Sequence, residues 1–188
     1  MSEQKKYEFT GEIKTIFGIE FKQIRAIVNF GCMVAGEIGG WIESEENLSQ
    51  SGNAWVSGDA RVSGNAEVSG NARVSGNARV YGNAWVSGNA EVSGNARVYG
   101  GARVSGDAEV KKDDDYMVVG GAGRYNRFTT FFKCRDKTIK VVCGCFFGTI
   151  IEFRAKVKET HKGNKHEKVY LAMADMAELQ ISNDEVEK

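Results

Sequence analysis

Ten consecutive hexapeptides between Ser51 and Val110 constrain the fold more than any other feature of the sequence. They run without insertion or deletion as SGNAWV, SGDARV, SGNAEV, SGNARV, SGNARV, YGNAWV, SGNAEV, SGNARV, YGGARV and SGDAEV. A short fixed period of this kind indicates a solenoid, in which each unit buries its apolar side only by stacking on its neighbours. Ala-X-Val favours a strand with Ala and Val on one side, and Gly-Asn or Gly-Asp favours a turn. The Ala and Val columns are therefore the predicted core.

The hexad also has the pattern of a known family. Taken from Val56, V-S-G-D-A-R has an aliphatic residue, a small residue after it and another small residue at the fifth position. In this the chain resembles the bacterial hexapeptide-repeat (LpxA-like) superfamily. The resemblance implies a left-handed parallel β-helix of triangular section with three hexads per coil. The predicted fold class is mainly β: such a β-helix, with an N-terminal β cap and a small C-terminal α+β domain.

The sequence on either side of the repeats predicts further segments. Six-residue steps from Val28 to Val34 and from Ile42 to Leu48 indicate an imperfect first coil before the regular repeats. Strand-like alternation around Gly18 predicts a hairpin that protects the first coil from edge-to-edge aggregation. The predicted organisation is a β-hairpin cap (1–27), the β-helix (28–110, with regular repeats over 51–110), a solvated KKDDD linker (111–115), an α+β module (116–182) and a disordered tail (183–188).

The C-terminal module is predicted as a three-stranded sheet packed by two helices. YMVV, RFTTFFKC and TIKVVCGCF are the predicted strands, with a turn at residues 135–137 between the last two. Thr149 and Glu152 form a capping box that opens the first helix, and Gly163 suits its C-terminal end. The second helix, about 166–181, is predicted to place five apolar side chains on or near one side: Val169, Tyr170, Met173, Met176 and Leu179.

This module resembles a short module of bacteriophage and prophage proteins. The matching segments are RYNRFTTFF (124–132), Cys143 to Thr149 and Glu152-Phe153. GGWIESEENLSQSGNAWV likewise resembles the opening of prophage hexapeptide-repeat proteins. Together these resemblances imply a phage or prophage origin, but they bring no activity to the module.

Stacking at a period of eighteen residues sorts the outward residues into three ladders. The first contains Trp55, Arg73, Glu91 and Glu109, the second Arg61, Arg79 and Arg97, and the third Glu67, Trp85 and Arg103. Like charges repel at the strand spacing of about 4.8 Å unless anionic groups neutralise them. Arg61, Arg79 and Arg97 are therefore candidate ligand-binding residues. The alternative interpretation is a solvated face on which the long side chains splay apart.

Four aromatic residues on the coils are candidate contacts between subunits. Trp55 and Trp85 are the tryptophans of the outer ladders, and Tyr81 and Tyr99 are spaced to stack on each other. Exposed aromatic residues on flat sheet faces often mark such contacts, and hexapeptide-repeat proteins that resemble this chain are commonly trimers. We therefore expect a homotrimer.

A Gly-rich segment, GGAGRYNR (120–127), offers a second candidate ligand site. Backbone N–H groups at Gly121 and Gly123, with Arg124 and Arg127, suit a phosphate, and the Tyr125 ring suits a base. The alternative is a Gly-rich connection into a strand. The segment is not a Walker loop, because the Lys-Ser ending and the following helix are missing.

Cysteine and histidine placement bears on metal binding and catalysis. Cys143 and Cys145 are predicted to face the same way on one strand, with Cys134 on the neighbouring strand. Together with His161 or His166, these thiols are candidate zinc ligands. The one-residue spacing instead favours buried, unligated thiols. Related acyltransferases use a histidine base and a projecting loop, and residues 51–110 contain neither. We predict no metal, no cofactor and no catalytic residue. The missing histidine and loop favour a protein that is not an enzyme.

Charge and hydropathy narrow the functional classes. The 25 basic and 25 acidic side chains cancel, which argues against general nucleic-acid or membrane binding, and no segment has the composition of a membrane span or secretion signal. We expect a cytoplasmic protein. The leading hypothesis is a non-enzymatic binding or assembly protein of phage type that inhibits host defence by binding a host protein or an anionic nucleotide signal. The alternatives are an acyl or nucleotidyl transferase and a structural phage component.

Overall fold

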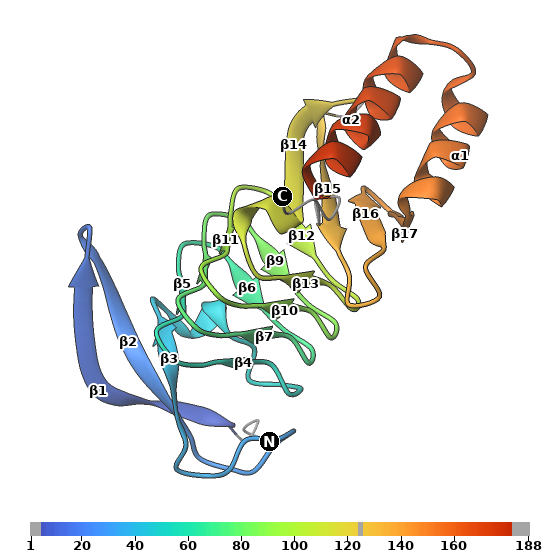
Figure 1. The fold of residues 1–188 in the computed structure, drawn as a ribbon. Helices are drawn as coiled ribbons and strands as arrows, with labels where there is room; N and C mark the ends of the chain where they lie inside the picture. Colours follow the sequence, from blue (N-terminus) through green and yellow to red (C-terminus); the bar gives the residue numbers. More distant parts are fainter. Residues whose placement is uncertain (1–4, 124–125, 182–188) are drawn as a thin grey trace, which may run out of the picture.

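The chain folds into a parallel β-solenoid with a hairpin at one end and an α+β module at the other (Figure 1). A computed structural model describes residues 5–123 and 126–181. Arg124, Tyr125 and the predicted tail lie outside these residues. The mainly β class and the parallel solenoid are confirmed, since the solenoid has about four turns and is followed by a small sheet with helices.

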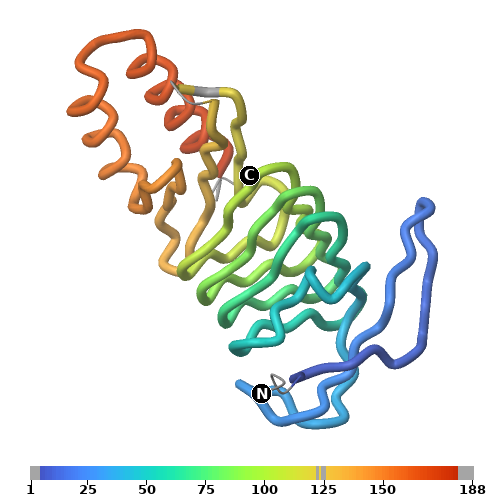
Figure 2. The backbone as a smooth tube through the Cα atoms, turned by 180° about the vertical axis from the view of Figure 1, so that it is seen from behind, coloured from blue at the N-terminus to red at the C-terminus, as the bar shows by residue number. Residues whose placement is uncertain are grey.

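The N-terminal hairpin lies at an edge of the largest sheet. Strands β1 (Tyr7–Ile16) and β2 (Ile19–Ala26) pair antiparallel around Phe17 and Gly18, which both have positive φ. β2 continues antiparallel onto β3 (Ile38–Ile42), which is the first strand to stack on the coils. Figure 2 shows the hairpin standing away from the solenoid rather than lying flat over its end. The predicted hairpin is confirmed.

Ten two-residue strands form the three faces of the solenoid. One face continues from β3 through β5, β8 and β11, a second contains β4, β7, β10 and β13, and the third contains β6, β9 and β12. Their bounds are β4 Trp55–Val56, β5 Arg61–Val62, β6 Glu67–Val68, β7 Arg73–Val74, β8 Arg79–Val80, β9 Trp85–Val86, β10 Glu91–Val92, β11 Arg97–Val98, β12 Arg103–Val104 and β13 Glu109–Val110. The pairing is parallel at a step of eighteen residues, so the three predicted ladders are confirmed.

Each hexad is held by the same small set of interactions. The Ala and Val side chains are at most 1% exposed, as a core between three narrow faces requires. Glycine turns the chain at positive φ, for example 69° at Gly52. Asparagine side chains hydrogen-bond from coil to coil, with Asn53 Nδ2 donating to Asn71 Oδ1 at 3.0 Å. The repeat therefore encodes core, turn and corner in six residues.

The first coil begins later than the predicted start near residue 28. Ile42 and Leu48 are fully buried and pair with the following coil, and a short 3-10 helix, η1 (Glu45–Asn47), lies between them. Val34, by contrast, is 62% exposed, so the six-residue step from Val28 does not mark a coil. Residues 27–37, between β2 and β3, form a loop. Two of its apolar residues have the six-residue spacing of the repeat, but they do not pair with the next coil.

The KKDDD segment is not a simple solvated linker. Asp113–Asp115 form a 3-10 helix, η2, and the Asp115 side chain is buried. One Asp115 carboxylate oxygen accepts the backbone N–H groups of Lys111 and Lys112 at 2.8 and 3.0 Å. This turn joins the last coil directly to the module instead of separating them.

The C-terminal sheet has four strands rather than the predicted three. Its order is β14 (Tyr116–Ala122), β15 (Arg127–Lys133), β16 (Ile139–Cys143) and β17 (Phe146–Thr149), all antiparallel. The third predicted strand divides because Gly144 adopts φ of 62° and turns the chain. Cys143 and Cys145 consequently lie on either side of a turn, not side by side on one strand.

Two helices pack on this sheet. Helix α1 (Ile150–His161) begins at the predicted capping box, in which Thr149 Oγ1 accepts the Glu152 N–H and Glu152 accepts the Thr149 N–H. It ends at His161, and Lys162 is its left-handed C-cap residue, just before Gly163. Helix α2 (Lys165–Ile181) buries Tyr170 and Met173 as predicted, but Met176 and Leu179 are 58% and 79% exposed. Ala174, Ala177 and Ile181 occupy the buried side instead.

Candidate ligand-binding groove

Three arginines lie in register on one face of the solenoid. Arg61 on β5 pairs with Arg79 on β8, which pairs with Arg97 on β11. Trp41 on β3 occupies the position before Arg61, so an aromatic ring begins the row. Because the residue between Ala and Val points outward in every hexad, repetition alone brings the three guanidinium groups together.

The N-terminal hairpin stands beside this row of arginines, on the other side of a groove (Figure 1). Lys14 on β1 lies 3.7 Å from the Asp59 carboxylate and 3.8 Å from the centroid of the Trp41 ring. These contacts tie the hairpin to the first coils. They leave the hairpin tip, with Phe17 95% exposed, beside the arginines.

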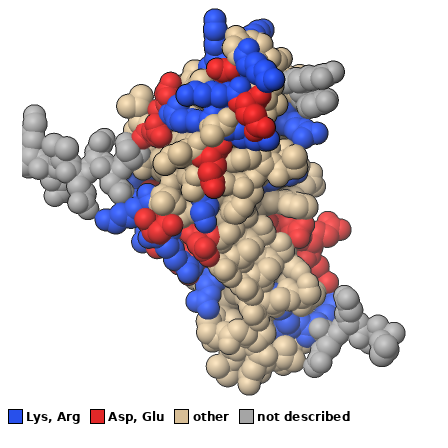
Figure 3. Space-filling model, turned by 90° about the vertical axis from the view of Figure 1, so that its right-hand side faces the viewer, with Lys and Arg blue, Asp and Glu red and all other residues tan. Residues whose placement is uncertain are grey.

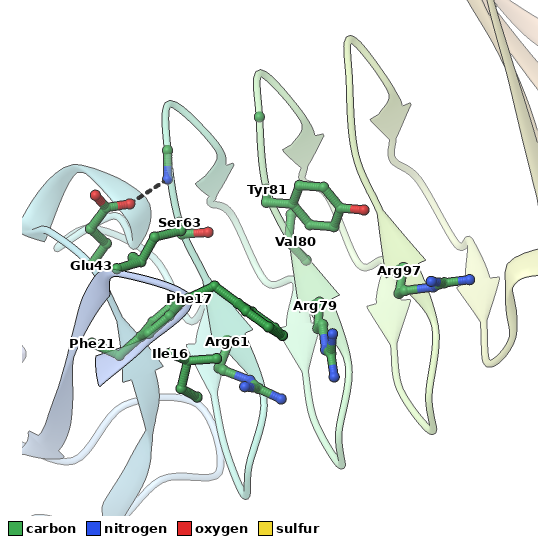
Figure 4. A pocket seen from close by; sticks show the side chains of 13 residues that line it. Ile16, Phe17, Phe21, Glu43, Arg61, Ser63, Arg79, Val80, Tyr81 and Arg97 are labelled. Carbon is green, nitrogen blue, oxygen red and sulfur yellow. Dashed lines mark hydrogen bonds between the residues drawn. The ribbon is translucent and has the colours of Figure 1, made fainter. Parts of the chain in front are cut away.

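Hairpin and coils enclose a groove of about 410 Å³, lined by residues from both. Figure 4 shows the three guanidinium groups in a row, with Phe17 and Phe21 on the hairpin side. Tyr81 stands next to Arg79 along the coil. Glu43 also borders the groove, where one of its oxygens accepts the Gly64 N–H at 2.7 Å. The groove thus combines a cationic floor with an apolar, aromatic wall.

Over residues 5–123 and 126–181, an ion pair compensates the positive charge only at the Arg97 end of the row. Arg97 donates to Asp113 through Nε, Nη2 and its backbone N–H. Burial opposes the ionisation of Asp113, but these hydrogen bonds hold the pKa of its carboxyl below the usual value. Among the described residues, no carboxylate forms an ion pair with Arg61 or Arg79.

The charge of Arg61 is destabilised by its surroundings in this row. Burial and the neighbouring Arg79 both lower the pKa of its guanidinium, and Asp59 raises it only in part. The Arg61 Nε atom is buried without a hydrogen-bond partner among the described residues. The Arg61 guanidinium stays ionised at neutral pH and lines the groove without a carboxylate ion pair in the described part of the chain, so it is suited to an added anion.

Three tyrosines in mutual contact lead from the groove toward the module, and the first of them, Tyr81, lines the groove. Tyr81 and Tyr99 stack with ring centroids 5.3 Å apart and an interplanar angle of 12°, which confirms the predicted stack. Tyr116 meets Tyr99 edge to face, and its hydroxyl donates to the Arg97 carbonyl oxygen at 2.7 Å. Tyr81 and Tyr99 are therefore part of the same face as the arginines.

The two tryptophans predicted for subunit contacts differ in their environments. Trp55 is 2% exposed, packed edge to face against Tyr7 and Phe30. The assignment of Trp55 to an outer interface is wrong, because the N-terminal segment covers it. Trp85 is 51% exposed, with the Arg103 guanidinium 5.6 Å from its ring centroid, and it remains a candidate.

The described residues of the Gly-rich segment lie away from this groove. Gly121 and Gly123 have positive φ, and Gly123 packs against Tyr170 of α2. Arg127 begins β15 and borders two cavities of the module. For the residues that the structure describes, the two predicted sets of ligand-binding residues therefore do not meet in one site, and the calls on Arg124 and Tyr125 lie outside those residues.

The four cysteines are free and do not gather. Cys134 is buried against the last coil, where burial raises the pKa of its thiol, and Cys32 lies at the other end of the chain. Within the described ranges, no three side chains of the metal-ligating types come together. The zinc interpretation has no support in this geometry.

The wall of the groove is the part that the sequence did not predict. The sequence predicts a hairpin that protects a sheet edge, and none of its side chains is predicted to line a site. One signal was present: a phenylalanine, Phe17, occupies the hairpin turn, where polar residues are usual.

Comparison with known proteins supports the repeat. Residues 66–82, 72–88 and 90–106 match the family model described as the YdcK β-solenoid repeat. The chain is a β-solenoid repeat protein. No curated protein is significantly similar to it. In the described part of the chain, neither helix has the length and apolar character needed to cross a bilayer.

Proposed function

We propose that this β-solenoid is a non-enzymatic binding protein that holds a nucleotide in the groove between the hairpin and the arginine row. The observation that carries the proposal is the pair Arg61 and Arg79, which face an aromatic wall without a carboxylate partner among the described residues. The groove volume of about 410 Å³ is within the usual range for small-molecule sites.

The chemistry of the two sides selects this ligand class. Arginine binds phosphate oxygens through charge-assisted hydrogen bonds, and the strand spacing sets two guanidinium groups close enough to share one phosphate chain. Phe17 and Tyr81 present ring faces or edges to a planar base. A purely inorganic anion would leave this aromatic wall unused, and an apolar ligand would cover Arg61 and Arg79 without compensating their charges.

The biological setting is part of the same proposal. A phage or prophage protein that sequesters an anionic nucleotide signal in the host cytoplasm would inhibit a defence that depends on that signal. The proposal also includes membership of the hexapeptide-repeat superfamily. It further includes a trimeric assembly in which Trp85 is one of the contacts. They rest on the sequence resemblance and on the exposed ladder residues.

Isothermal titration calorimetry of the full chain with ADP, ATP and cyclic di-AMP tests the ligand class. We expect saturable binding of at least one of them and a loss of about tenfold or more in affinity for Arg79→Gln. Arg73→Gln is the matched control, because Arg73 lies on a different face. Wild-type protein that binds none of the three nucleotides, or an Arg79→Gln variant with unchanged affinity, would refute the proposal.

A second titration separates the aromatic wall from the cationic floor. Phe17→Ala should weaken nucleotide binding but leave the affinity for inorganic pyrophosphate unchanged, because Phe17 offers no hydrogen bond to phosphate. Phe17 is almost fully exposed, so its removal leaves the core intact. Equal effects on both ligands would show that the ring does not contact a base.

A protein ligand is the second candidate function, favoured by the exposed apolar surface of the hairpin. Ile13 is 54% and Phe17 95% exposed, which is unusual for a projecting hairpin unless it contacts another molecule. Capture from a host lysate with wild-type and Phe17→Ala bait distinguishes this candidate, since only a hairpin-specific partner is lost with the ring. The transferase and virion-component hypotheses predict, respectively, turnover of an acyl or nucleotidyl donor and presence in purified virions.

A further inference from the structure

The C-terminal module encloses a second cavity, separate from the groove. It measures about 560 Å³ and lies between the sheet and the two helices. The turn between β16 and β17, helix α1 and the start of α2 all contribute side chains. Nothing in the groove proposal depends on it.

Aromatic rings form the inner wall of this module cavity. Phe153 meets Phe146 at 5.6 Å and Tyr170 edge to face at 5.8 Å, and the ring of His161 stacks on Tyr170 at 5.4 Å. His166 lies 5.8 Å from His161. A flat ring entering the cavity would therefore meet ring faces and edges rather than flexible aliphatic chains.

Polar groups converge at one side of the same cavity. Tyr170 is 9% exposed, and Cys143 also lines the cavity, where its sulfur accepts the Thr129 hydroxyl at 3.2 Å. Burial, and then the Cys143 thiol, raise the pKa of Tyr170 to about 12, with Arg127 acting in the opposite direction. The phenol keeps its proton at neutral pH, and a ligand that accepts its hydrogen bond would replace Cys143, to which the hydroxyl is hydrogen-bonded.

Two glycines make room for this arrangement. A β-carbon at Gly144 would lie 2.6 Å from Arg127 Nη1, and one at Gly123 would lie 2.7 Å from Tyr170 Cζ. Each glycine thus lets a polar side chain approach the backbone at the rim. The turn Cys143-Gly144-Cys145 is shaped around the Arg127 guanidinium.

Basic side chains contribute to the lining of this cavity. Arg127 and Lys156 both contribute to it, and none of the described residues that line it is Asp or Glu. The nearest acidic partner of Lys156 is Glu159, one turn along the exposed side of α1, at 2.9 Å. Figure 3 shows how densely charged side chains cover this module compared with the solenoid below it.

We propose that this cavity binds a small aromatic anion, namely a carboxylate or phosphate attached to a single ring. Arg127 and Lys156 neutralise the anionic group, Tyr170 donates a hydrogen bond to it, and the rings of Phe153 and His161 hold the aromatic part. The ring favours the aromatic wall over bulk water, and a lining with Arg127 and Lys156 but without a carboxylate among its described residues favours an anion over a cation.

The same assignment accounts for sequence segments that the groove leaves unexplained. Arg127 comes from RYNRFTTFF, Cys143, Cys145 and Phe146 come from CGCFFGT, and Phe153 comes from the Glu-Phe pair at the start of α1. Three separated segments with unusual composition therefore meet at one cavity. The remaining residues of the second segment make its turn and cap the helix.

Ligand-observed NMR of the full chain with phenyl phosphate and benzoate tests the proposal, with benzamide and inorganic phosphate as partial ligands. We expect saturable binding of at least one aromatic anion and at least fivefold weaker binding of both partial ligands. Whichever of phenyl phosphate and benzoate binds more tightly identifies the anionic group. The absence of saturable binding for both aromatic anions would overturn the proposal, as would inorganic phosphate binding as tightly as phenyl phosphate.

Variants locate the binding in this cavity. Lys156→Gln should weaken it several-fold, whereas Lys158→Gln, on the same helix but outside the cavity, should not. Both lysines are exposed, so neither change threatens folding. Tyr170→Phe keeps the ring and removes the donor, and it should also weaken binding. Arg79→Gln should leave it unchanged, and equal binding by Lys156→Gln, Tyr170→Phe and wild type would refute the site.

Discussion

The ring of Phe128 on β15 occupies the space that a side chain at Gly101 on the last coil would need. A β-carbon at Gly101 would lie 2.6 Å from Phe128 Cγ, and one at Gly120 would lie 2.6 Å from another carbon of the same ring. Position 101 is the corner at which the other regular hexads carry Asn or Asp. The single glycine in the asparagine column therefore marks where the module docks onto the solenoid.

Restoring the repeat at this position should destabilise the protein. Gly101→Asn forces the Phe128 ring to move and should lower the free energy of unfolding by about 1–3 kcal/mol, as overpacking usually does. Urea denaturation measures the change. Asp107→Asn, which also restores the usual asparagine, is the control and should be near neutral. A stabilised Gly101→Asn variant would show that the Phe128 ring is not fixed where the module docks onto the solenoid.

This contact between the solenoid and the module shows why the periodic part of the chain was easier to predict than its ends. Within the repeats, each residue stacks on the residue at the same position of the hexad eighteen residues away. The spacing alone therefore predicts the strand, the face and the ladder to which each residue belongs. The ends depend on contacts between unlike segments. Cys134 pairs with Ala108 and Tyr116 packs in the solenoid core, although the sequence placed both in a separate module behind a linker.

The candidate sites follow the same division. The arginine row was predicted from the period, but the hairpin wall at Phe17 was not, because the angle of a hairpin to a coil depends on contacts such as Lys14 with Trp41. In α2, the helical period predicted burial of Leu179, yet the sheet covers only the side that includes Ala174 and Ala177. Small alanines allow close packing that a hydrophobicity pattern does not anticipate.

Removing Arg79 should not destabilise the ligand-free protein. Arg79 is exposed and adjoins two like charges at the strand spacing, so Arg79→Gln should raise stability at low salt by a few tenths of a kcal/mol. The gain should disappear in high salt, which screens exposed charges. Arg97→Gln is the contrasting variant, because it also breaks the ion pair with Asp113. Thermal unfolding at two salt concentrations measures both, and a salt-independent loss for Arg79→Gln would contradict the expectation.

The two tryptophans should respond differently to truncation. Trp55→Ala leaves a large cavity beneath the N-terminal segment and should cost about 3–5 kcal/mol. Trp85→Ala removes a half-exposed ring and should cost less than about 1 kcal/mol in the monomer. If Trp85 is a subunit contact as proposed, sedimentation should show dissociation of the Trp85→Ala oligomer at concentrations at which wild type stays assembled. Unchanged sedimentation would remove Trp85 from the interface.

Lys6 should make stability depend on pH in the alkaline range. Its side chain is 4% exposed, and Nζ donates to the Ala54 carbonyl oxygen at 2.9 Å. Burial lowers its pKa from 10.5 to about 8. Below pH 8 the folded protein bears the full cost of the buried charge. Between about pH 8 and 10.5 the unfolded chain binds more protons than the folded one, so stability rises with pH there.

The measurement compares wild type with Lys6→Met in urea at several pH values from 7 to 10.5. The stability of wild type relative to the variant should increase by up to about 3 kcal/mol across this range, since other titrating groups are common to both proteins. Lys5→Met is the control, because Lys5 is exposed and pairs with Glu45 at the surface. Parallel curves for wild type and Lys6→Met would mean that the Lys6 ammonium reaches water in the folded state.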